Sequence, residues 1–170
     1  QSLIIPRKGS RQFTMKKERG RRAINCEIRF VESAEEFQGI LEVFREVFDW
    51  EKPDFPDSSY LANVLGNPHF LVFVAKAEGK IIGGLTAYIF PSYQTRKSSI
   101  FIYDLGVATN FQRQGIGKSL IDKLLDYAKN HQIQDIFVDT ELEDNEDALA
   151  FYQKTGFDSQ AKVVQYTYDC

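Results

Sequence analysis

The chain has 170 residues, of which 43% are hydrophobic and 26% charged, and its formal net charge is −3. This length suits one domain with its own core. No apolar run approaches the roughly 20 residues of a membrane span, and no secretory-type apolar segment begins the chain, so we expect a cytoplasmic protein without a membrane partner. Two cysteines and two histidines in scattered positions form no zinc or disulfide pattern, and we expect no metal.

Charge is divided unevenly along the chain. Residues 1–22 hold eight basic residues and one acid, so residues 23–170 carry a formal charge of −10. An acidic body repels nucleic acid and attracts cations, which argues against a nucleic-acid partner. The basic arm lacks periodicity, and its Met15 suggests a cloning-derived tail or an alternative start. We therefore expect residues 23–170 to form a single domain.

The first half of that domain shows clear element signals. Residues 24–31 alternate apolar and polar side chains, which predicts a half-buried strand. Ser33 and Glu36 form a capping box before a helix that reaches Phe48, and a short helix follows Asp57 or Ser58. Strands are expected over 70–77 and 80–90, and Glu78-Gly79 predicts a tight hairpin between them.

The second half alternates strands and helices. A strand is expected over 98–108, a helix over 115–130 with one apolar face, and a strand over 135–140. A helix over 145–155 and a final strand region through Tyr168 complete the order β-α-α-β-β-β-α-β-α-β, which predicts an α/β domain.

The turn Gln112-Arg113-Gln114-Gly115-Ile116-Gly117 leaves a hydrophobic strand and opens an amphipathic helix. Unpaired N–H groups and the positive end of the helix dipole favour phosphate at such a place. A Walker loop is excluded because Asn110 or Phe111 stands where its first glycine belongs, and a dinucleotide fingerprint is weak because its third glycine is replaced by Leu120. A plain helix entry remains the alternative.

The glycine turn, together with Asn145-x-x-Ala148-x-x-x-Tyr152-x-x-x-Gly156-Phe157, resembles the GCN5-related N-acetyltransferase superfamily. The resemblance implies the GNAT fold: a mixed central sheet of about six to seven strands, flanked by about four helices, with splayed middle strands that hold the cofactor. Within the superfamily, residues 99–105, the turn and residues 57–61 look like aminoglycoside 3-N-acetyltransferases of the gentamicin-resistance type.

The resemblance implies acetyl-CoA as the cosubstrate. Backbone N–H groups of one continuous segment would hold its pyrophosphate, namely Arg113, Gln114, Gly115, Ile116, Gly117 and Lys118. Its pantetheine arm would pair like an extra strand with the backbone of Leu105 and Val107. Asn145 would hold the arm from the other side, although Asn is also an excellent helix cap.

Two residues would carry the chemistry by the same resemblance. Tyr152 would be the general acid that protonates the departing thiolate; the alternative is a core tyrosine. Asp104 would orient the amine and accept its proton, since desolvation can raise a carboxylate pKa toward a useful value. The alternative for Asp104 is a structural carboxylate that caps a β-bulge.

A cationic aminoglycoside would need further carboxylates around its ammonium groups. Tyr103 and Asp104 are expected to contact it, together with the acidic loop residues Asp139, Glu141, Glu143 and Asp144. Acetylation of a polyamine, another small amine or a protein N-terminus is the alternative, and a non-catalytic acyl-CoA-binding module is a third. A homodimer is possible.

Overall fold

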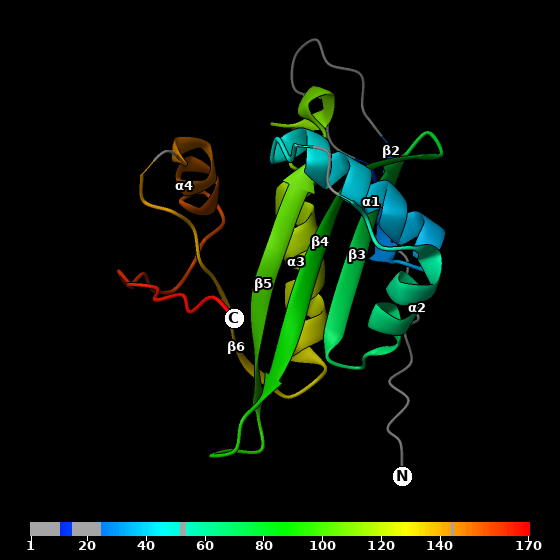
Figure 1. The fold of residues 1–170 in the computed structure, drawn as a ribbon. Coiled ribbons are helices and arrows are strands. Elements are labelled where there is room, and N and C mark those ends of the chain that lie inside the picture. The colour runs from blue at the N-terminus through cyan, green and yellow to red at the C-terminus, as the bar shows by residue number, and fades with distance from the viewer. Residues whose placement is uncertain (1–10, 15–24, 52–53, 144) are drawn as a thin grey trace. The chain divides into compact units, whose positions relative to one another are not determined.

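A computed structural model describes residues 11–14, 25–51, 54–143 and 145–170 (Figure 1). The strands in chain order are β1 (Arg11–Thr14), β2 (Asn25–Phe30), β3 (Phe70–Ala77), β4 (Lys80–Pro91), β5 (Ser98–Val107) and β6 (Ile133–Val138). The helices are α1 (Ala34–Val47), α2 (Ser58–Gly66), α3 (Ile116–Lys129) and α4 (Glu146–Tyr152), and a single 3-10 turn, η1, spans Thr109–Phe111.

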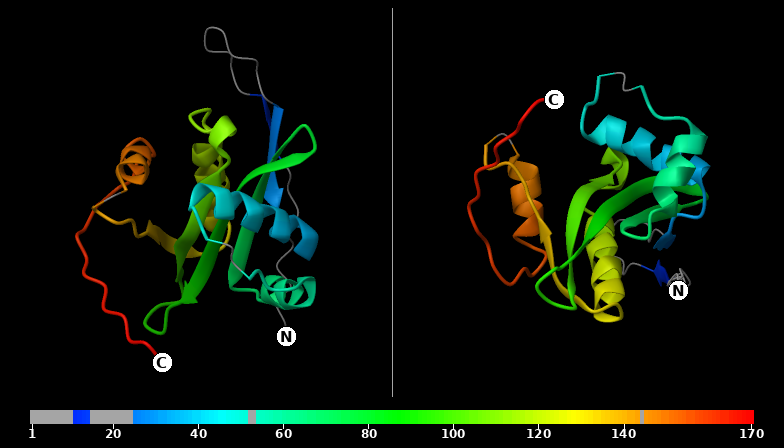
Figure 2. Two further views of the ribbon diagram at one scale, coloured as in Figure 1. Left: turned by 45° about the horizontal axis from the view of Figure 1, so that its top comes forward. Right: turned by 60° about the horizontal axis from the view of Figure 1, so that its bottom comes forward.

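The strands form one sheet in the order β1-β2-β3-β4-β5-β6. All neighbours are antiparallel except β5 and β6, which are parallel and are joined through α3. Helices α1 and α2 cover one face of the sheet and α3 covers the other, as the two views in Figure 2 show. The buried core therefore lies in two layers, one on each side of β3 and β4.

The expected local signals explain why α1 lies where it does. Ser33 caps the helix by accepting the N–H of Glu36, and the apolar stripe of α1 turns Phe37, Ile40 and Phe44 into the core. A Cβ at Gly84 of β4 would meet Ile40 Cγ2 at 2.5 Å. Glycine at this position lets α1 lie close against the sheet.

The expected helices are confirmed, and so are five of the expected strands. The expected C-terminal strand through Tyr168 is wrong, because residues 157–170 form no strand and Val163 and Val164 are 69% and 77% exposed. β-propensity alone does not order a segment that has no neighbouring strand to pair with. The resemblance implied about six to seven strands. The sheet has six, of which five come from expected segments and the sixth is β1, which lies in the basic arm and was not expected.

The chain divides into two compact units, residues 1–138 and residues 139–170. The first contains the whole sheet with α1, α2 and α3, and the second contains α4. No helix in the described part of the chain is both long and apolar enough to cross a membrane. The rest of the basic arm, Met15 included, lies outside the described residues.

Candidate active site

A β-bulge in β5 determines which way Asp104 points. Asp104 pairs with Thr86 of β4, but Ile102 pairs with Ala87, so Tyr103 is one residue extra on β5. Thr86 and Ala87 are consecutive and therefore point to opposite faces of the sheet, and paired residues share a face. Asp104 and Ile102 consequently face opposite ways. In a regular strand Asp104 would share the face of Ile102, which is buried.

The bulge turns Asp104 into an aromatic cavity of about 340 Å³ on the α1 and α2 side of the sheet. Asp104 is its only acid among the described lining residues. The walls come from α1, α2, β4, β5 and the segment after α1, and they include Trp50, Phe55, Tyr60, Tyr88 and Tyr103. Tyr103 is 63% exposed and meets Tyr88 edge to face, with ring centroids 5.7 Å apart. Tyr103 and Asp104, which the sequence predicted as substrate-contacting residues, therefore both line this cavity.

The carboxylate of Asp104 has an environment suited to a base. Burial raises its pKa above the ordinary value, and a hydrogen bond from Thr86 opposes this rise. Thr86 Oγ1 lies 3.2 Å from Asp104 Oδ2. The alternative role for Asp104, a structural carboxylate that caps a β-bulge, also fits in part, because Asp104 lies at the bulge.

The end of β5 presents an unpaired edge. The parallel ladder between β5 and β6 ends at the pair Ile102 and Val138. Ala108 N–H donates to Ile82 C=O of the β4 side, so the N–H and C=O groups of Leu105 and Val107 point the other way. Among the described residues no strand pairs with this edge. Its free backbone groups could therefore hydrogen-bond to an extended ligand that lies alongside β5 like an added strand.

The edge of Val107 is partly occupied. Gln112 Nε2 donates to Val107 C=O at 2.9 Å, which ties the glycine turn to the end of β5. An extended ligand would therefore have the N–H of Val107 and both backbone groups of Leu105. This contact was not expected from the sequence.

The turn from 112 to 117 is strongly curved. Arg113 and Gly115 have φ values of 56° and 80°, and Gly115 is the N-cap of α3. The first hydrogen bond of the helix runs from Ser119 N–H to Gly115 C=O, so the N–H groups of Ile116, Gly117 and Lys118 precede it and have no acceptor within the helix.

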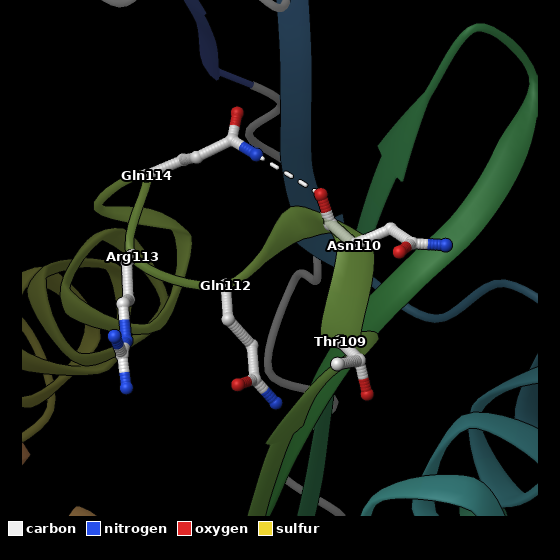
Figure 3. Close-up of a pocket in the computed structure, with 5 residues that line it drawn as sticks. All are labelled: Thr109, Asn110, Gln112, Arg113 and Gln114. Atoms are coloured by element: carbon white, nitrogen blue, oxygen red, sulfur yellow. Dashed lines mark hydrogen bonds between the residues drawn. The ribbon is translucent and has the colours of Figure 1, made fainter.

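A polar cavity of about 390 Å³ lies beside this turn and is lined by Thr109, Asn110, Gln112, Arg113 and Gln114 (Figure 3). Gln114 Nε2 donates to Asn110 C=O at 3.2 Å and braces the turn. Figure 3 shows the side chains of Gln112 and Arg113 extending from the same side of the turn. Backbone N–H groups, a helix dipole and an arginine together fit a pyrophosphate.

Lys118 adds little through its side chain. Its Nζ is bonded to Asp122 at 2.8 Å and 2.9 Å along the surface of α3. The buried side chain of Ile116 anchors the start of the helix instead. Ile116 and Lys118 are therefore expected to contribute to phosphate binding through their backbone N–H groups.

The remaining expected residues lie in the second unit. Burial raises the pKa of Tyr152 to about 12, so its hydroxyl stays protonated at neutral pH. Asn145 is the N-cap of α4, but its side chain makes no capping bond and Nδ2 instead donates to Thr140 Oγ1 at 3.2 Å. Asp139, Glu141 and Glu143 are exposed, and Asp144 lies outside the described residues.

Sequence reasoning missed the cavity walls and the partner of Asp104. Trp50, Tyr88 and Thr86 all line the cavity, yet each is typical of an ordinary core position in its own segment. A threonine inside the otherwise apolar centre of β4 was the available signal, because a buried hydroxyl needs a partner.

Comparison with known proteins agrees with this geometry. The model of the acetyltransferase (GNAT) family matches residues 35–157. N-alpha-acetyltransferase 30 of Schizosaccharomyces pombe is 35% identical over 66 residues, which are 39% of this chain and 43% of the relative. N-alpha-acetyltransferase 60 of Xenopus tropicalis is 27% identical over 136 residues, 69% of this chain and 55% of the relative. The chain spans about half the length of the curated relatives it matches.

Solved structures resemble nearly the whole chain. One is the aminoglycoside acetyltransferase meta-AAC0020 from an uncultured soil metagenomic sample, solved with trehalose and with sisomicin. It is 35% identical with a TM-score of 0.82, over 85% of this chain and 96% of that chain. The aminoglycoside acetyltransferase HMB0005, also from an uncultured soil metagenomic sample, is 28% identical with a TM-score of 0.76, over 85% and 99%.

Proposed function

The chain belongs to the acetyltransferase (GNAT) family, and we propose that it transfers the acetyl group of acetyl-CoA to an aminoglycoside, at the 3-amine of the central deoxystreptamine ring. The observation that carries this proposal is the carboxylate of Asp104, turned by the bulge into an aromatic cavity beside the unpaired edge of β5. The likeness to a soil enzyme solved with sisomicin supports the substrate class.

The cavity has the chemistry that a cationic sugar requires. Aromatic faces such as those of Trp50, Tyr60 and Tyr88 attract ammonium groups and stack on ring faces. One carboxylate among them selects a single amine and orients it. Asp139, Glu141 and Glu143 would draw the remaining ammonium groups, each contributing about 0 to 1 kcal/mol as an exposed ion pair.

The residues of the first unit would hold the cosubstrate. The N–H groups from Arg113 to Lys118 would bind the pyrophosphate, and Leu105 and Val107 would pair with the pantetheine arm. When bound, acetyl-CoA supplies an acetyl thioester whose carbonyl carbon takes the amine nitrogen as the bond to sulfur breaks. Asn145 would hold the arm from the second unit.

The nitrogen of the ammonium group must lose two protons during this reaction, and the departing sulfur must gain one. Asp104 takes a proton from the ammonium group, because a protonated amine has no lone pair with which to attack. The hydroxyl of Tyr152, which stays protonated because burial raises its pKa to about 12, gives its proton to the departing sulfur. The second proton that the nitrogen loses as the amide forms restores this hydroxyl. Neither role uses a metal.

The test is a CoA-release assay with gentamicin, sisomicin, spermidine and a peptide with a free N-terminus. We expect turnover with the two aminoglycosides, and NMR of the product should locate the new amide at the 3-amine. Absence of turnover with both aminoglycosides would exclude the proposed substrate, and an amide at another amine would correct the position.

A protein N-terminus is the second candidate acceptor, since two of the curated relatives are N-alpha-acetyltransferases. Turnover of the peptide alone would favour it. Acetyl-CoA binding without turnover of any acceptor would favour the non-catalytic module. Cytoplasmic location and a homodimer stay predictions.

A further inference from the structure

Among the described residues, Thr86 is the one residue of the polar and charged types that is buried, with 3% exposure. A buried hydroxyl is costly unless it is hydrogen-bonded. Both of its bonds go to one residue: Asp104 N–H donates to Thr86 Oγ1 at 3.1 Å, and Thr86 Oγ1 donates to Asp104 Oδ2 at 3.2 Å. The hydroxyl of Thr86 is thus hydrogen-bonded to both the backbone N–H and the carboxylate of Asp104.

This double contact stands at the register shift. The pair Thr86 and Asp104 is the last one before Tyr103 is accommodated as the extra residue. A bulge interrupts the backbone ladder locally, and here a side-chain hydroxyl accepts the N–H of Asp104. The hydroxyl therefore supports both the bulge and the rotamer of the carboxylate.

The second carboxylate oxygen is differently placed. Oδ1 of Asp104 has no hydrogen-bond partner among the described residues, and it is not a buried unsatisfied atom. Asp104 is also one of the residues that line the aromatic cavity. One oxygen is therefore held by the protein, and the other remains for a ligand.

We propose that Thr86 is a positioning residue for acetyl transfer: its hydroxyl holds Oδ2 of Asp104 in one orientation, so that Oδ1 is left to receive the proton of the acceptor amine. This inference rests on the proposed function, because it takes Asp104 to be the proton acceptor. In this scheme Thr86 acts through Asp104 and transfers no proton itself.

The electrostatics of the cavity give the hydroxyl a measurable effect. Burial raises the pKa of Asp104, and the hydrogen bond from Thr86 lowers it because it stabilises the charged form. The other titratable side chains of the cavity wall are Tyr60 of α2, Tyr88 of β4 and Tyr103 of β5, whereas the lining residues of α1 and of the segment after it are apolar. Removal of the Thr86 hydroxyl should therefore raise the pKa of Asp104 further, because only the effect of burial then remains.

The experiment compares Thr86→Val, which keeps the shape and loses the hydroxyl, with Thr86→Ser, which keeps the hydroxyl. The direct measurement is a ¹³C-carboxyl NMR titration of Asp104 in the free enzyme, assigned with Asp104→Asn. Since a hydrogen bond to a charged group contributes about 1.5 kcal/mol or more, we expect Thr86→Val to raise the pKa of Asp104 by about one unit. Thr86→Ser should stay near the wild type.

Kinetics provide the second readout. The acid limb of kcat/KM reports the ionisation of the base in the free enzyme. A base whose pKa rises loses activity at a higher pH, so the limb of Thr86→Val should move upward by about one unit, and Thr86→Ser should restore it. Thr95→Val removes a hydroxyl in the β4–β5 loop, where Thr95 Oγ1 donates to Lys97 C=O, and should move neither readout.

Superimposable titration curves for wild type and Thr86→Val would overturn the role of Thr86, and so would a kcat/KM limb that stays in place while the titration shifts. If Thr86→Val does not fold, Thr86→Ala serves as the hydroxyl-free variant in both measurements. The titration needs no acceptor, so a shifted curve with no aminoglycoside turnover would overturn the substrate assignment, and the kinetic arm then uses whichever amine the acceptor panel identifies.

Discussion

Arg29 holds both carboxylate oxygens of Glu36, with Nη1 to Oε2 at 2.8 Å and Nη2 to Oε1 at 2.6 Å. Lys76 Nζ donates to Oε1 at 2.9 Å. Glu36 belongs to α1, and both cations belong to the sheet, so this cluster fastens the helix to β2 and β3. Since Phe37 and Leu41 of the same helix line the aromatic cavity, the cluster also stabilises one wall of the site.

Glu36→Gln should destabilise the protein by on the order of 1–3 kcal/mol at neutral pH. The guanidinium of Arg29 is the main cause that lowers the pKa of Glu36 from 4.5 to about 2. A lowered carboxyl pKa contributes stability that is present above the unfolded value and is lost as the pH falls through the folded value. The stability difference between wild type and variant should therefore shrink between pH 4.5 and pH 2 in urea titrations.

The exposed pair Arg45 and Glu42, at 2.8 Å, offers the matched control. Its side chains are 48% and 57% exposed, so Glu42→Gln should cost less than about 1 kcal/mol. Equal losses for Glu36→Gln and Glu42→Gln would contradict the role assigned to the half-buried cluster of Arg29, Glu36 and Lys76.

Asp104→Asn should lose at least about 10²-fold in kcat with little change in the affinity for acetyl-CoA. The amide keeps the shape of the carboxylate and can bond Thr86, but it cannot take a proton from the amine at neutral pH. Stopped-flow or calorimetric binding of acetyl-CoA, beside steady-state kinetics, separates the two quantities. A parallel fall in turnover and cofactor affinity would show that Asp104 serves the fold or the cofactor.

Tyr152→Phe should lower kcat by about 10² to 10⁴. Because the hydroxyl of Tyr152 has a pKa of about 12, it is protonated across the usual assay range, and the ratio of wild-type to variant rates should stay constant from about pH 6 to pH 9. Tyr93→Phe, at a tyrosine that is 94% exposed in the β4–β5 loop, is the control. An unaltered rate for Tyr152→Phe would remove Tyr152 from the mechanism.

Salt should weaken aminoglycoside binding more than acetyl-CoA binding. Asp139, Glu141 and Glu143 are exposed, and attraction between exposed charges is screened over about 10 Å at 0.1 M salt. We expect KM for gentamicin to rise with NaCl, and we expect the rise to flatten when all three acids are replaced by their amides. The same slope in that triple variant would place the docking charges elsewhere.

Local signals predicted much of this chain because they depend on near neighbours. The cap formed by Ser33 and Glu36, the cap of α2 by Asp57 and the Glu78-Gly79 hairpin all involve residues within a few positions of one another. The C-terminal strand was wrong for the complementary reason. Its side chains favour a strand, but a strand exists only where a neighbour pairs with it.

The sequence by itself determined the family pattern, the glycine turn at the start of α3 and the identity of Asp104 as a charge in an apolar strand. Only the tertiary structure decided where that charge points: the shift of one residue at Tyr103 turns the carboxylate from the face of Ile102 into the aromatic cavity. The physical reason is that side chains alternate across a sheet, so a bulge reverses the face, and register is settled by the neighbouring strand. Thr86, 18 positions away in the chain, pairs with Asp104 in this register and hydrogen-bonds to it through its hydroxyl.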